Sequence, residues 1–284
     1  NTGSVDDLAG LAELCRRERL WFHVDGAIGA VVTLSSAHRA LMRGMEQAMM
    51  DQMTLGLSTR NYEPSIRALC EGYGIKKSSV SRRFITASKK ALDELMSRDI
   101  GKLDLCVLFI DGVVRGGQCV IVSVGVDRQG KKHCLGLWQG ATENATVAKA
   151  LLQDLIRRGL KAETRYLFII DGAKALSSAV RKTFPKAEIQ RCQLHKRRNV
   201  AGHLPETYQA DVDRRIRSAY QMKGYTEAKA ELEKVVRYLD ELNPSAARSL
   251  EEGLEETLTV HRLGLPELLR SSLNTTNIIE SSLS

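Results

Sequence analysis

The sequence has no hydrophobic run long enough to cross a membrane. No apolar stretch among its 284 residues approaches the roughly 20 that a spanning helix needs, and no charged segment followed by an apolar one marks an export signal. The six cysteines include no Cys-x-x-Cys pair, which argues against a disulfide framework. We therefore expect a globular cytoplasmic protein with reduced thiols and no membrane partner.

Acidic residues are scarce in two parts of a chain that is basic overall. Lysine and arginine exceed aspartate and glutamate by 42 − 34 = 8, so the long-range electrostatic field favours a polyanionic partner. Residues 76–90 hold six basic residues and no acidic one, and residues 181–203 hold seven basic residues against Glu188 alone. These stretches are candidate DNA-binding surfaces, although a solvated lysine-rich helix face is the alternative for either one.

A helical pattern covers residues 46–100 and is broken at the sequence GYGI. Pro64 suits the first turn of a helix, and Ser78 or Ser79 suits the N-cap of a second helix after the break. This spacing is typical of a helix-turn-helix, whose second helix enters the major groove of DNA; a plain helical hairpin is the alternative. The side chains that we expect to face DNA are Lys76, Lys77, Ser79, Ser81, Arg82 and Arg83.

Strand and helix patterns alternate in residues 101–203, which indicates an α/β fold. The segments DLCVLFIDG, CVIVSVGVD and KHCLGLWQG predict three strands joined by short glycine-containing turns, as in an antiparallel meander. A helix from about Thr142, a strand that ends at Asp171, a second helix, a further strand and a basic helix follow. Residues 204–270 lack strand signals and predict an all-α insertion, and residues 271–284 predict the opening of one more helix.

Two of the predicted strands run into an Asp-Gly pair, at Asp111 and at Asp171. Such a pair is often a turn signal, but the first and fourth strands of this order can lie side by side and bring the two carboxylates together. Carboxylates held that closely repel each other unless cations share the site, and Mg²⁺ prefers such oxygen ligands. Two Mg²⁺ ions about 3.5–4 Å apart would stabilise the attacking and leaving oxygens of a phosphodiester exchange. We therefore expect a two-metal site at these aspartates.

A third acid that could complete this site is Glu280, near the end of the sequence. The spacing Asn277-x-x-Glu280 puts an amide and a carboxylate on one face of a helix. The same pattern before an apolar run is also typical of a helix capping box, so the spacing alone leaves both roles open.

Four segments taken together resemble the mutator-type transposases of bacterial insertion sequences. They are LFIDGVV, LFIIDGAKAL, RCQLHKRRNV and NTTNIIESS, which occur in this order within residues 46–284. The resemblance implies a ribonuclease H-like fold, a mixed sheet flanked by helices, with a helical insertion between the second and third acids. It also implies that Asp111, Asp171 and Glu280 are the metal-binding catalytic triad of a DDE enzyme that uses two Mg²⁺ or Mn²⁺ ions.

The resemblance also implies roles for residues around these acids. Its Cys-x-x-His signature is matched by Cys192 and His195. Zinc would need further ligands, so a buried cysteine at a strand end is the simpler interpretation, with His195 contacting a DNA phosphate or supporting the acids. Glu143 is a candidate accessory acid, with helix-dipole complementarity as the alternative, and Asn277 would point at the metals. The basic residues expected to bind DNA phosphates are Arg191, Lys196, Arg197 and Arg198.

Residues 1–45 resemble a different family, the pyridoxal-phosphate-dependent amino-acid decarboxylases. In the segment LWFHVDGA, Asp25 matches the aspartate that pairs with the pyridine nitrogen of the cofactor. The family's Schiff-base lysine has no match here, so the covalent anchor for the cofactor is missing. We interpret this segment as a foreign fragment joined near Met45, with an ordinary piece of the same domain as the alternative.

The combined expectation is a DDE transposase that cleaves DNA and transfers the strands of an insertion sequence. Its partners would be the terminal inverted repeats and target DNA, bound by a homo-oligomer in the cytoplasm, at the bacterial nucleoid. The sequence stops four residues after Glu280, from which we expect a truncated enzyme of doubtful activity. The alternatives are an inactive DNA-binding relic or regulator and, more remotely, a decarboxylase fragment.

Overall fold

The computed structural model describes residues 7–18, 88–115 and 118–280. The chain forms two compact units that divide between Asp93 and Glu94. In the first unit, α1 (Leu8–Glu18) buries Leu8 and Ala12, which lie one helical turn apart on the same face. The residues predicted to pair with a cofactor or to face DNA from the helix-turn-helix lie outside the described residues, namely Asp25, Lys76, Lys77, Ser79, Ser81, Arg82 and Arg83.

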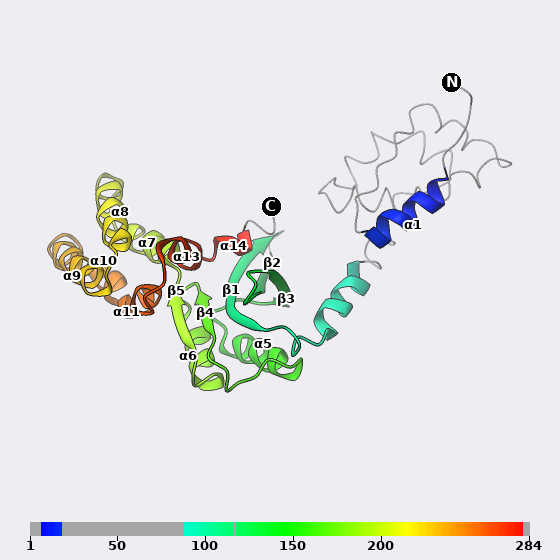
Figure 1. Ribbon diagram of the computed structural model, residues 1–284. Helices are drawn as coiled ribbons and strands as arrows, with labels where there is room; N and C mark the ends of the chain where they lie inside the picture. The colour runs from blue at the N-terminus through cyan, green and yellow to red at the C-terminus, as the bar shows by residue number, and fades with distance from the viewer. Residues whose placement is uncertain (1–6, 19–87, 116–117, 281–284) are drawn as a thin grey trace, which may run out of the picture. The chain divides into compact units, whose positions relative to one another are not determined.

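A five-stranded mixed sheet is the framework of the second unit (Figure 1). Its strands are β1 (Leu105–Arg115), β2 (Gln118–Asp127), β3 (Lys132–Gln139), β4 (Leu167–Ile170) and β5 (Glu188–Arg191). They lie in the order β3-β2-β1-β4-β5, with β1, β2 and β3 antiparallel, and with β4 and β5 parallel to β1. This order confirms the predicted meander and the predicted adjacency of the first and fourth strands.

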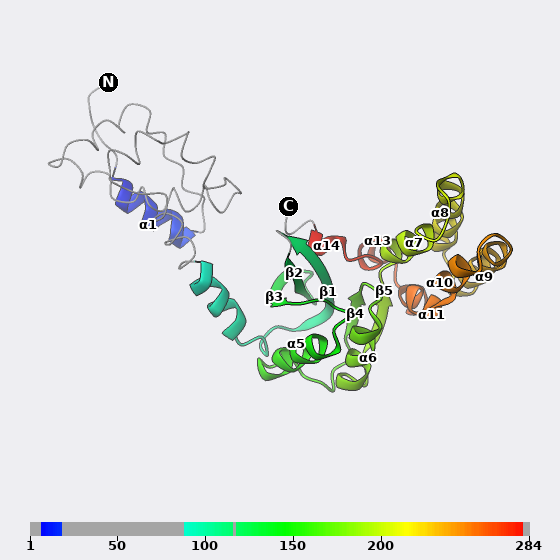
Figure 2. The same cartoon turned by 180° about the vertical axis from the view of Figure 1, so that it is seen from behind.

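Helices make up most of the rest of the second unit. Two of them, α5 (Ala145–Arg157) and α6 (Lys174–Thr183), connect strands, and the unit begins within a helix that covers residues 88–97. Those after β5 are α7 (Gln193–Ala201), α8 (Glu206–Gln221), α9 (Tyr225–Leu242), α10 (Pro244–Glu251), α11 (Leu254–Thr257), α12 (Thr259–Arg262), α13 (Glu267–Leu273) and α14 (Asn277–Glu280). In Figures 1 and 2, α7 to α10 lie beside β5, at one edge of the sheet. Helices α8, α9 and α10 share a core that includes Val212, Ile216, Leu232, Leu239 and Leu250.

Apolar residues of the central strands alternate between the two faces of the sheet. Ile110 of β1 and Ile170 of β4 lie in the core that α5 and α6 complete. Phe109 and Ile169, one position earlier in each strand, lie in a separate core with Ile279 of α14. The central strands are therefore buried on both faces, which is typical of parallel strand pairs.

The short helix α14 brings the last described residues back to the sheet. It contacts β1 and β2, and its Ile279 is fully buried. Just before it, the backbone carbonyl of Asn274 accepts a hydrogen bond of 2.8 Å from the backbone N–H of Gln193, at the start of α7. As a result α14 is held on the sheet face that carries Phe109 and Ile169.

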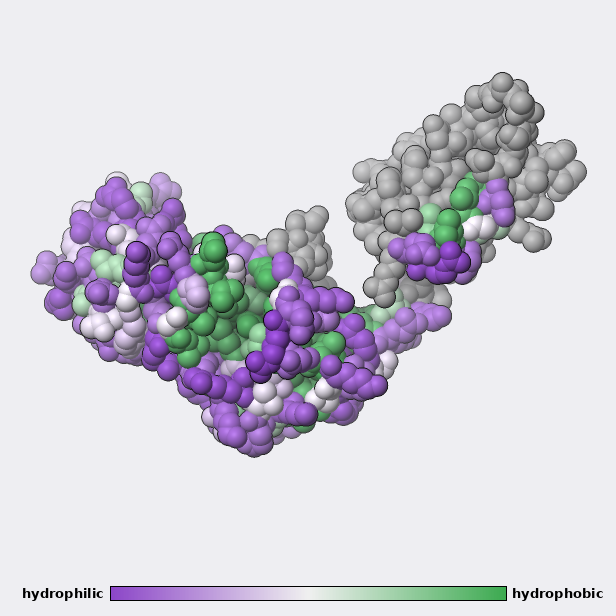
Figure 3. Space-filling view, viewed as in Figure 1, coloured by the Kyte–Doolittle hydropathy of each residue, from purple (hydrophilic) through white to green (hydrophobic). Residues whose placement is uncertain are grey.

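Hydrophobic side chains gather near the middle of the face of the second unit that Figure 3 shows. The most exposed large hydrophobic side chains include Leu268 and Leu269 of α13, at 84% and 50%. None of the helices that the structure describes combines the length and the apolar character needed to cross a membrane.

Candidate active site

Asp111 and Asp171 lie side by side on neighbouring strands. The parallel pairing of β1 with β4 aligns Ile110 with Ile170, so the next residues, the two aspartates, also face each other across strands about 4.8 Å apart. Because side chains alternate along a strand, Asp111 shares the sheet face of Phe109, and Asp171 directly follows the end of β4 beside it. The face of Asp111 is the one on which α14 lies, and the pairing of the two strands agrees with the predicted closeness of the two acids.

Asp111 is the more deeply enclosed of the two acids, with only 4% of its surface exposed. Its Oδ1 accepts a hydrogen bond of 2.9 Å from the backbone N–H of Gly112. Burial raises the pKa of Asp111, and the neighbouring charge of Asp171 raises it further. A hydrogen bond from Thr276 and the charge of the nearby His195 lower this pKa, but the net shift is upward. A cation bound beside Asp111 would offset both unfavourable effects.

Asp171 is fixed by three hydrogen bonds. Its Oδ1 accepts from the backbone N–H groups of Gly172 and Ala173, at 2.8 and 3.0 Å. Its Oδ2 accepts from the hydroxyl of Thr142 at 2.6 Å. Thr142 is 5% exposed and was not among the predicted site residues. No local pattern reveals it, because its partner lies 29 positions further along the chain.

The glycines after the two aspartates have different conformations. Gly112 continues β1 and pairs with Ile121 of the antiparallel strand β2. The interpretation of this Asp-Gly pair as a turn is therefore wrong. Gly172 has a φ of +145°, in the region that favours glycine, and leads from β4 into α6. The second Asp-Gly pair therefore does turn the chain.

Cys192 and His195 form a polar pair close to the acids. Cys192 follows β5 and is fully buried, and its Sγ accepts a hydrogen bond of 3.6 Å from the hydroxyl of Thr276. A hydrogen bond to Cys192 raises the pKa of His195 to about 9, and the charges of Asp111 and Asp171 add to this rise although burial opposes it. Burial raises the pKa of Cys192, but its interactions with His195 outweigh that effect and leave the pKa below its ordinary value. At neutral pH His195 therefore carries a positive charge close to Asp111 and Asp171.

The predicted third acid, Glu280, lies on α14, which contacts β1 and β2. The side chain of Glu280 is outside the described residues. Asn277 is exposed at the start of the same helix, and Glu143 is exposed just before Asn144, the N-cap of α5. Within the described part of the chain, no three His, Cys, Asp or Glu side chains are grouped so that they could hold a metal ion. A metal ion bound by Asp111 and Asp171 would therefore need a further ligand.

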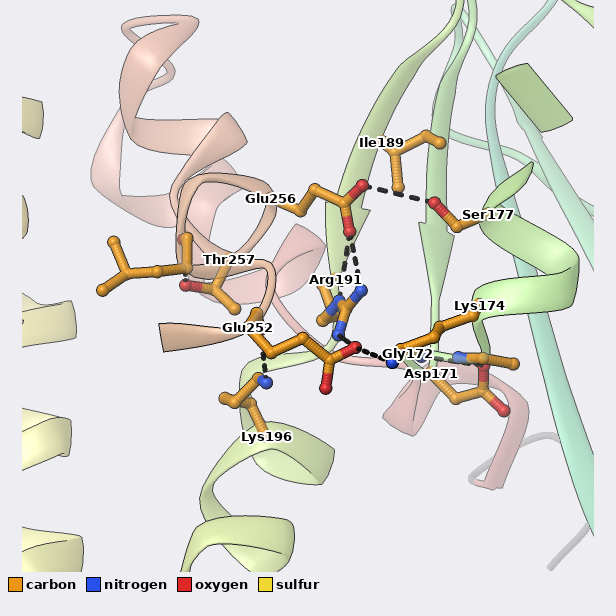
Figure 4. Close-up of polar contacts among 12 residues, drawn as sticks. Asp171, Gly172, Lys174, Ser177, Ile189, Arg191, Lys196, Glu252, Glu256 and Thr257 are labelled. Carbon is orange, nitrogen blue, oxygen red and sulfur yellow. Dashed lines mark hydrogen bonds and ion pairs between the residues drawn. The ribbon is translucent and has the colours of Figure 1, made fainter. Parts of the chain in front are cut away.

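Arg191 and Lys196, predicted to bind DNA phosphates, are instead buried against the helical insertion (Figure 4). Arg191 is 7% exposed and forms ion pairs with Glu256 at 3.0 Å and Glu252 at 3.7 Å. Lys196 is 3% exposed and donates to the backbone carbonyls of Ser249 and Glu252, at 2.5 and 2.6 Å. Contrary to the prediction, neither side chain is free to reach DNA, because each is already desolvated and bonded within the protein.

The other two basic residues of α7 differ from each other. Arg197 binds Asp213 of α8 through two parallel hydrogen bonds of 2.6 and 2.8 Å, a strong geometry for such a pair. Arg198 is exposed. The basic stretch of the sequence therefore retains only Arg198 as an exposed candidate on α7 for contact with DNA.

Comparison with known proteins places the chain among transposases. Residues 32–283 match the family described as "Transposase, Mutator family". The match begins within residues 1–45, the segment predicted from the sequence to be foreign. The resemblance of the residues before 32 to the decarboxylases stays a prediction.

Three similar proteins illustrate the relationship. The transposase for insertion sequence element IS6120 of Mycolicibacterium smegmatis is 30% identical over 80% of this chain and 71% of its own length. The transposase for ISRM5 of Rhizobium meliloti (strain 1021) is 30% identical over 84% of this chain and 60% of its own length. The transposase for IS256 in transposon Tn4001 of Staphylococcus aureus is 24% identical over 84% and 62%. The matched region spans between 60 and 71% of these three relatives, and it includes both aspartates of the site. The chain belongs to the Mutator family of transposases.

Proposed function

We propose that this chain is the catalytic part of an insertion-sequence transposase that cleaves DNA and transfers strands with the help of Mg²⁺ or Mn²⁺. The observation that carries the proposal is the parallel pairing of β1 with β4, because Asp111 and Asp171 directly follow the paired residues Ile110 and Ile170. The relatives that the chain resembles are named transposases for insertion sequence elements, which supports the same reaction class.

The side chains at this site suit a hard divalent cation. Both acids offer carboxylate oxygens, and the raised pKa of Asp111 reflects burial and repulsion that a bound cation would relieve. Glu280 is the proposed third ligand, because α14 contacts β1, the strand of Asp111, on the sheet face that carries Phe109. Bound divalent ions would supply a Lewis acid and a more acidic water at the scissile phosphate.

The remaining residues of the site would orient groups and balance charge. Thr142 and the amides of Gly172 and Ala173 hold Asp171, as their hydrogen bonds indicate. His195, with a pKa of about 9, would carry its proton at neutral pH and add positive charge where a DNA phosphate approaches the acids. The buried Cys192 lies beside this histidine, and its interactions with His195 lower the pKa of the thiol.

The rest of the proposal concerns the fold and DNA binding. A mixed sheet flanked by helices is consistent with the ribonuclease H-like fold that the family resemblance implies. We propose that residues 46–100 bind the terminal inverted repeats through a helix-turn-helix, and that the protein acts on paired DNA ends as a homo-oligomer at the nucleoid. Arg198 of α7 is a candidate phosphate contact on the catalytic unit, because it is basic and exposed.

Substitution of the two aspartates tests the proposed reaction. In the full chain, Asp111→Asn and Asp171→Asn each keep the size of the side chain and remove its charge. We expect metal-dependent nicking of DNA that carries the ends of the element to fall by more than about 100-fold. Loss of a hydrogen-bond partner of a metal ligand lowers activity by up to roughly 100-fold, and loss of the ligand itself should lower it more. Binding of the same DNA in a gel-shift assay should stay within about threefold of the wild type, since the proposed DNA contacts lie elsewhere.

Asp104→Asn is the matched control. Asp104 lies just before β1, at the opposite end of the strand from Asp111, and its side chain is 61% exposed in an ion pair with Arg128. Such an exposed pair contributes little to stability, so this variant should cleave like the wild type. Full cleavage by Asp111→Asn or Asp171→Asn would overturn the proposed site. A wild-type chain that binds DNA without cleaving it in Mg²⁺ or Mn²⁺ would favour a DNA-binding relic.

A further inference from the structure

Thr142 occupies a position that none of the sequence motifs indicates. It lies in the connection between β3 and α5, with 5% of its surface exposed, and its hydroxyl donates to Oδ2 of Asp171 at 2.6 Å. A hydrogen bond from a hydroxyl to an ionised carboxylate is shorter and stronger than one between neutral groups. This hydrogen bond therefore joins two segments that lie 29 positions apart in the sequence.

The backbone on either side of Thr142 is itself fixed. Before it, the N–H of Gly140 donates to the carbonyl of Cys119 in β2 at 2.9 Å, and Gly140 has a φ of +130°. After it, the side chain of Asn144 caps α5 by accepting from the N–H groups of Thr146 and Val147. Thr142 is thus held from both sides.

The three hydrogen bonds to Asp171 leave one direction open. A carboxylate has about four lone-pair positions, two on each oxygen. The amides of Gly172 and Ala173 use both positions on Oδ1, and the hydroxyl of Thr142 uses one on Oδ2. The position that remains is on Oδ2, and the direction in which it points depends on where Thr142 holds that oxygen.

Thr142 also lies near the strand of the other acid. A Cβ built on Gly112 would lie 3.8 Å from Cγ2 and 3.9 Å from Oγ1 of Thr142, so this side chain is close to the residue that follows Asp111. One side chain therefore lies near both segments that carry an aspartate of the proposed site, and its hydroxyl is bonded to one of these aspartates.

We propose that Thr142 is a positioning residue of the proposed metal site, which fixes the orientation of the Asp171 carboxylate that would hold a divalent cation. This inference rests on the proposed function, because it assumes that the two aspartates hold divalent ions. It adds a residue outside the acidic triad, and it predicts that metal affinity depends on a hydroxyl that does not itself need to contact the metal.

The test compares Thr142→Val, Thr142→Ser and wild-type full-length protein. Valine keeps the branched shape but lacks the hydroxyl, whereas serine keeps the hydroxyl. We expect Thr142→Val to weaken Mn²⁺ binding about 10–100-fold, and Thr142→Ser to stay within about threefold of the wild type. Mn²⁺ binding is measured by electron paramagnetic resonance titration without DNA, and the half-saturating Mn²⁺ concentration for DNA cleavage should shift in parallel.

A structural role alone would give a different pattern. It would lower the thermal unfolding midpoint of Thr142→Val without metal and leave its Mn²⁺ affinity unchanged. If Thr142→Val does not fold, Thr142→Ala removes the same hydroxyl with less steric demand, and the same loss of Mn²⁺ affinity is expected. Thr146→Val, at an exposed threonine in the first turn of α5, is the matched control and should bind Mn²⁺ like the wild type.

Asp171→Asn separates a failure of this inference from a failure of the proposed function. If Asp171→Asn loses Mn²⁺ binding and Thr142→Val does not, the positioning role is overturned and the metal site stands. If Asp171→Asn binds Mn²⁺ as tightly as the wild type, both the metal site and the role of Thr142 are overturned.

Discussion

Asp111 and Asp171 lie side by side but are held in different ways. Asp111 sits within a regular strand whose backbone continues past it, so burial by neighbouring side chains determines its surroundings. Asp171 sits where a strand gives way to a helix, and free backbone amides of the turn bind its carboxylate. The two acids therefore depend on different features of the backbone around them.

This difference predicts unequal effects of alanine on the free energy of unfolding at the two following glycines. Gly172→Ala forces a side chain into a φ of +145°, and its Cβ would approach Arg191 Cδ to 3.4 Å, so we expect the free energy of unfolding to fall by about 1–3 kcal/mol. Gly112→Ala adds a methyl group in a strand with its nearest neighbour at 3.8 Å, so a change below about 1 kcal/mol is expected. Urea unfolding measures both values, and equal losses would contradict the distinction.

At the scale of elements, the helical insertion is attached to the edge strand β5 by polar contacts. Gln190 donates to the backbone carbonyl of Thr257 and accepts from the N–H of Val260, and Thr259 donates to the carbonyl of Ile189. Helices α11 and α12 thereby cover a strand edge that would otherwise expose hydrogen-bonding groups. These contacts explain how the insertion is tied to the sheet near Arg191.

Gly253 shows how closely the insertion approaches this strand. It precedes α11 with a φ of +66°, and a Cβ there would lie 2.5 Å from Cζ of Arg191. Only glycine combines that backbone conformation with the space that the guanidinium of Arg191 occupies. Gly253 lies between Glu252 and Glu256 in the sequence. The ion pairs of Arg191 with these two acids therefore depend on the absence of a side chain at Gly253.

Lys196 makes the attachment of α7 to α10 dependent on pH. Burial lowers its pKa from 10.5 to about 8, with Arg191 and Lys174 acting in the same direction and Glu252 and Glu256 opposing. Between about pH 8 and 10.5 the unfolded chain binds the proton more than the folded chain does. The contribution of this residue to the free energy of unfolding therefore rises with pH in that window.

The predicted measurement compares wild type with Lys196→Met, which removes the titrating group and keeps an unbranched side chain. The stability difference, wild type minus variant, should rise by up to about 3 kcal/mol from pH 8 to pH 10.5, because one pKa unit corresponds to about 1.4 kcal/mol. Urea unfolding at four or five pH values gives this difference. A flat profile, or a fall with increasing pH, would contradict the prediction.

At the scale of the whole molecule, the second unit has apolar cores of its own. Both faces of the sheet and the helices of the insertion are packed with residues from after Glu94. We therefore expect residues 88–284 to fold without the preceding segment. The fragment should unfold cooperatively on heating, as followed by circular dichroism at 222 nm, and loss of that transition would show that the second unit depends on the first.

Basic residues that cluster in the sequence are not all unpaired in the folded chain. The chain has a formal net charge of +8, and α7 belongs to one of its most basic stretches. In the folded chain, however, Arg191 and Arg197 are paired with acids that lie 65 and 16 positions later. A count of charges in a window of sequence cannot include partners that only folding supplies.

Much of the arrangement around the site could be predicted because its signals are local. Apolar runs that end on Asp111 and Asp171 identified the strands, and the order of strands and helices allowed the first and fourth strands to be neighbours. Thr142 could not be predicted, because nothing in its surrounding sequence distinguishes it from other threonines. The burial of Lys196 could not be predicted either, because the carbonyls that bind it belong to a helix about 50 positions later.

The sequence by itself determined the strands, the class of fold and the two acids, because alternation and apolar runs are properties of neighbouring residues. Tertiary structure alone decided which groups surround those acids and which basic side chains remain exposed. The physical reason is that burial, ion pairing and hydrogen bonding depend on distances in space. Those distances are established only when the sheet, the connection that carries Thr142 and the helical insertion pack together.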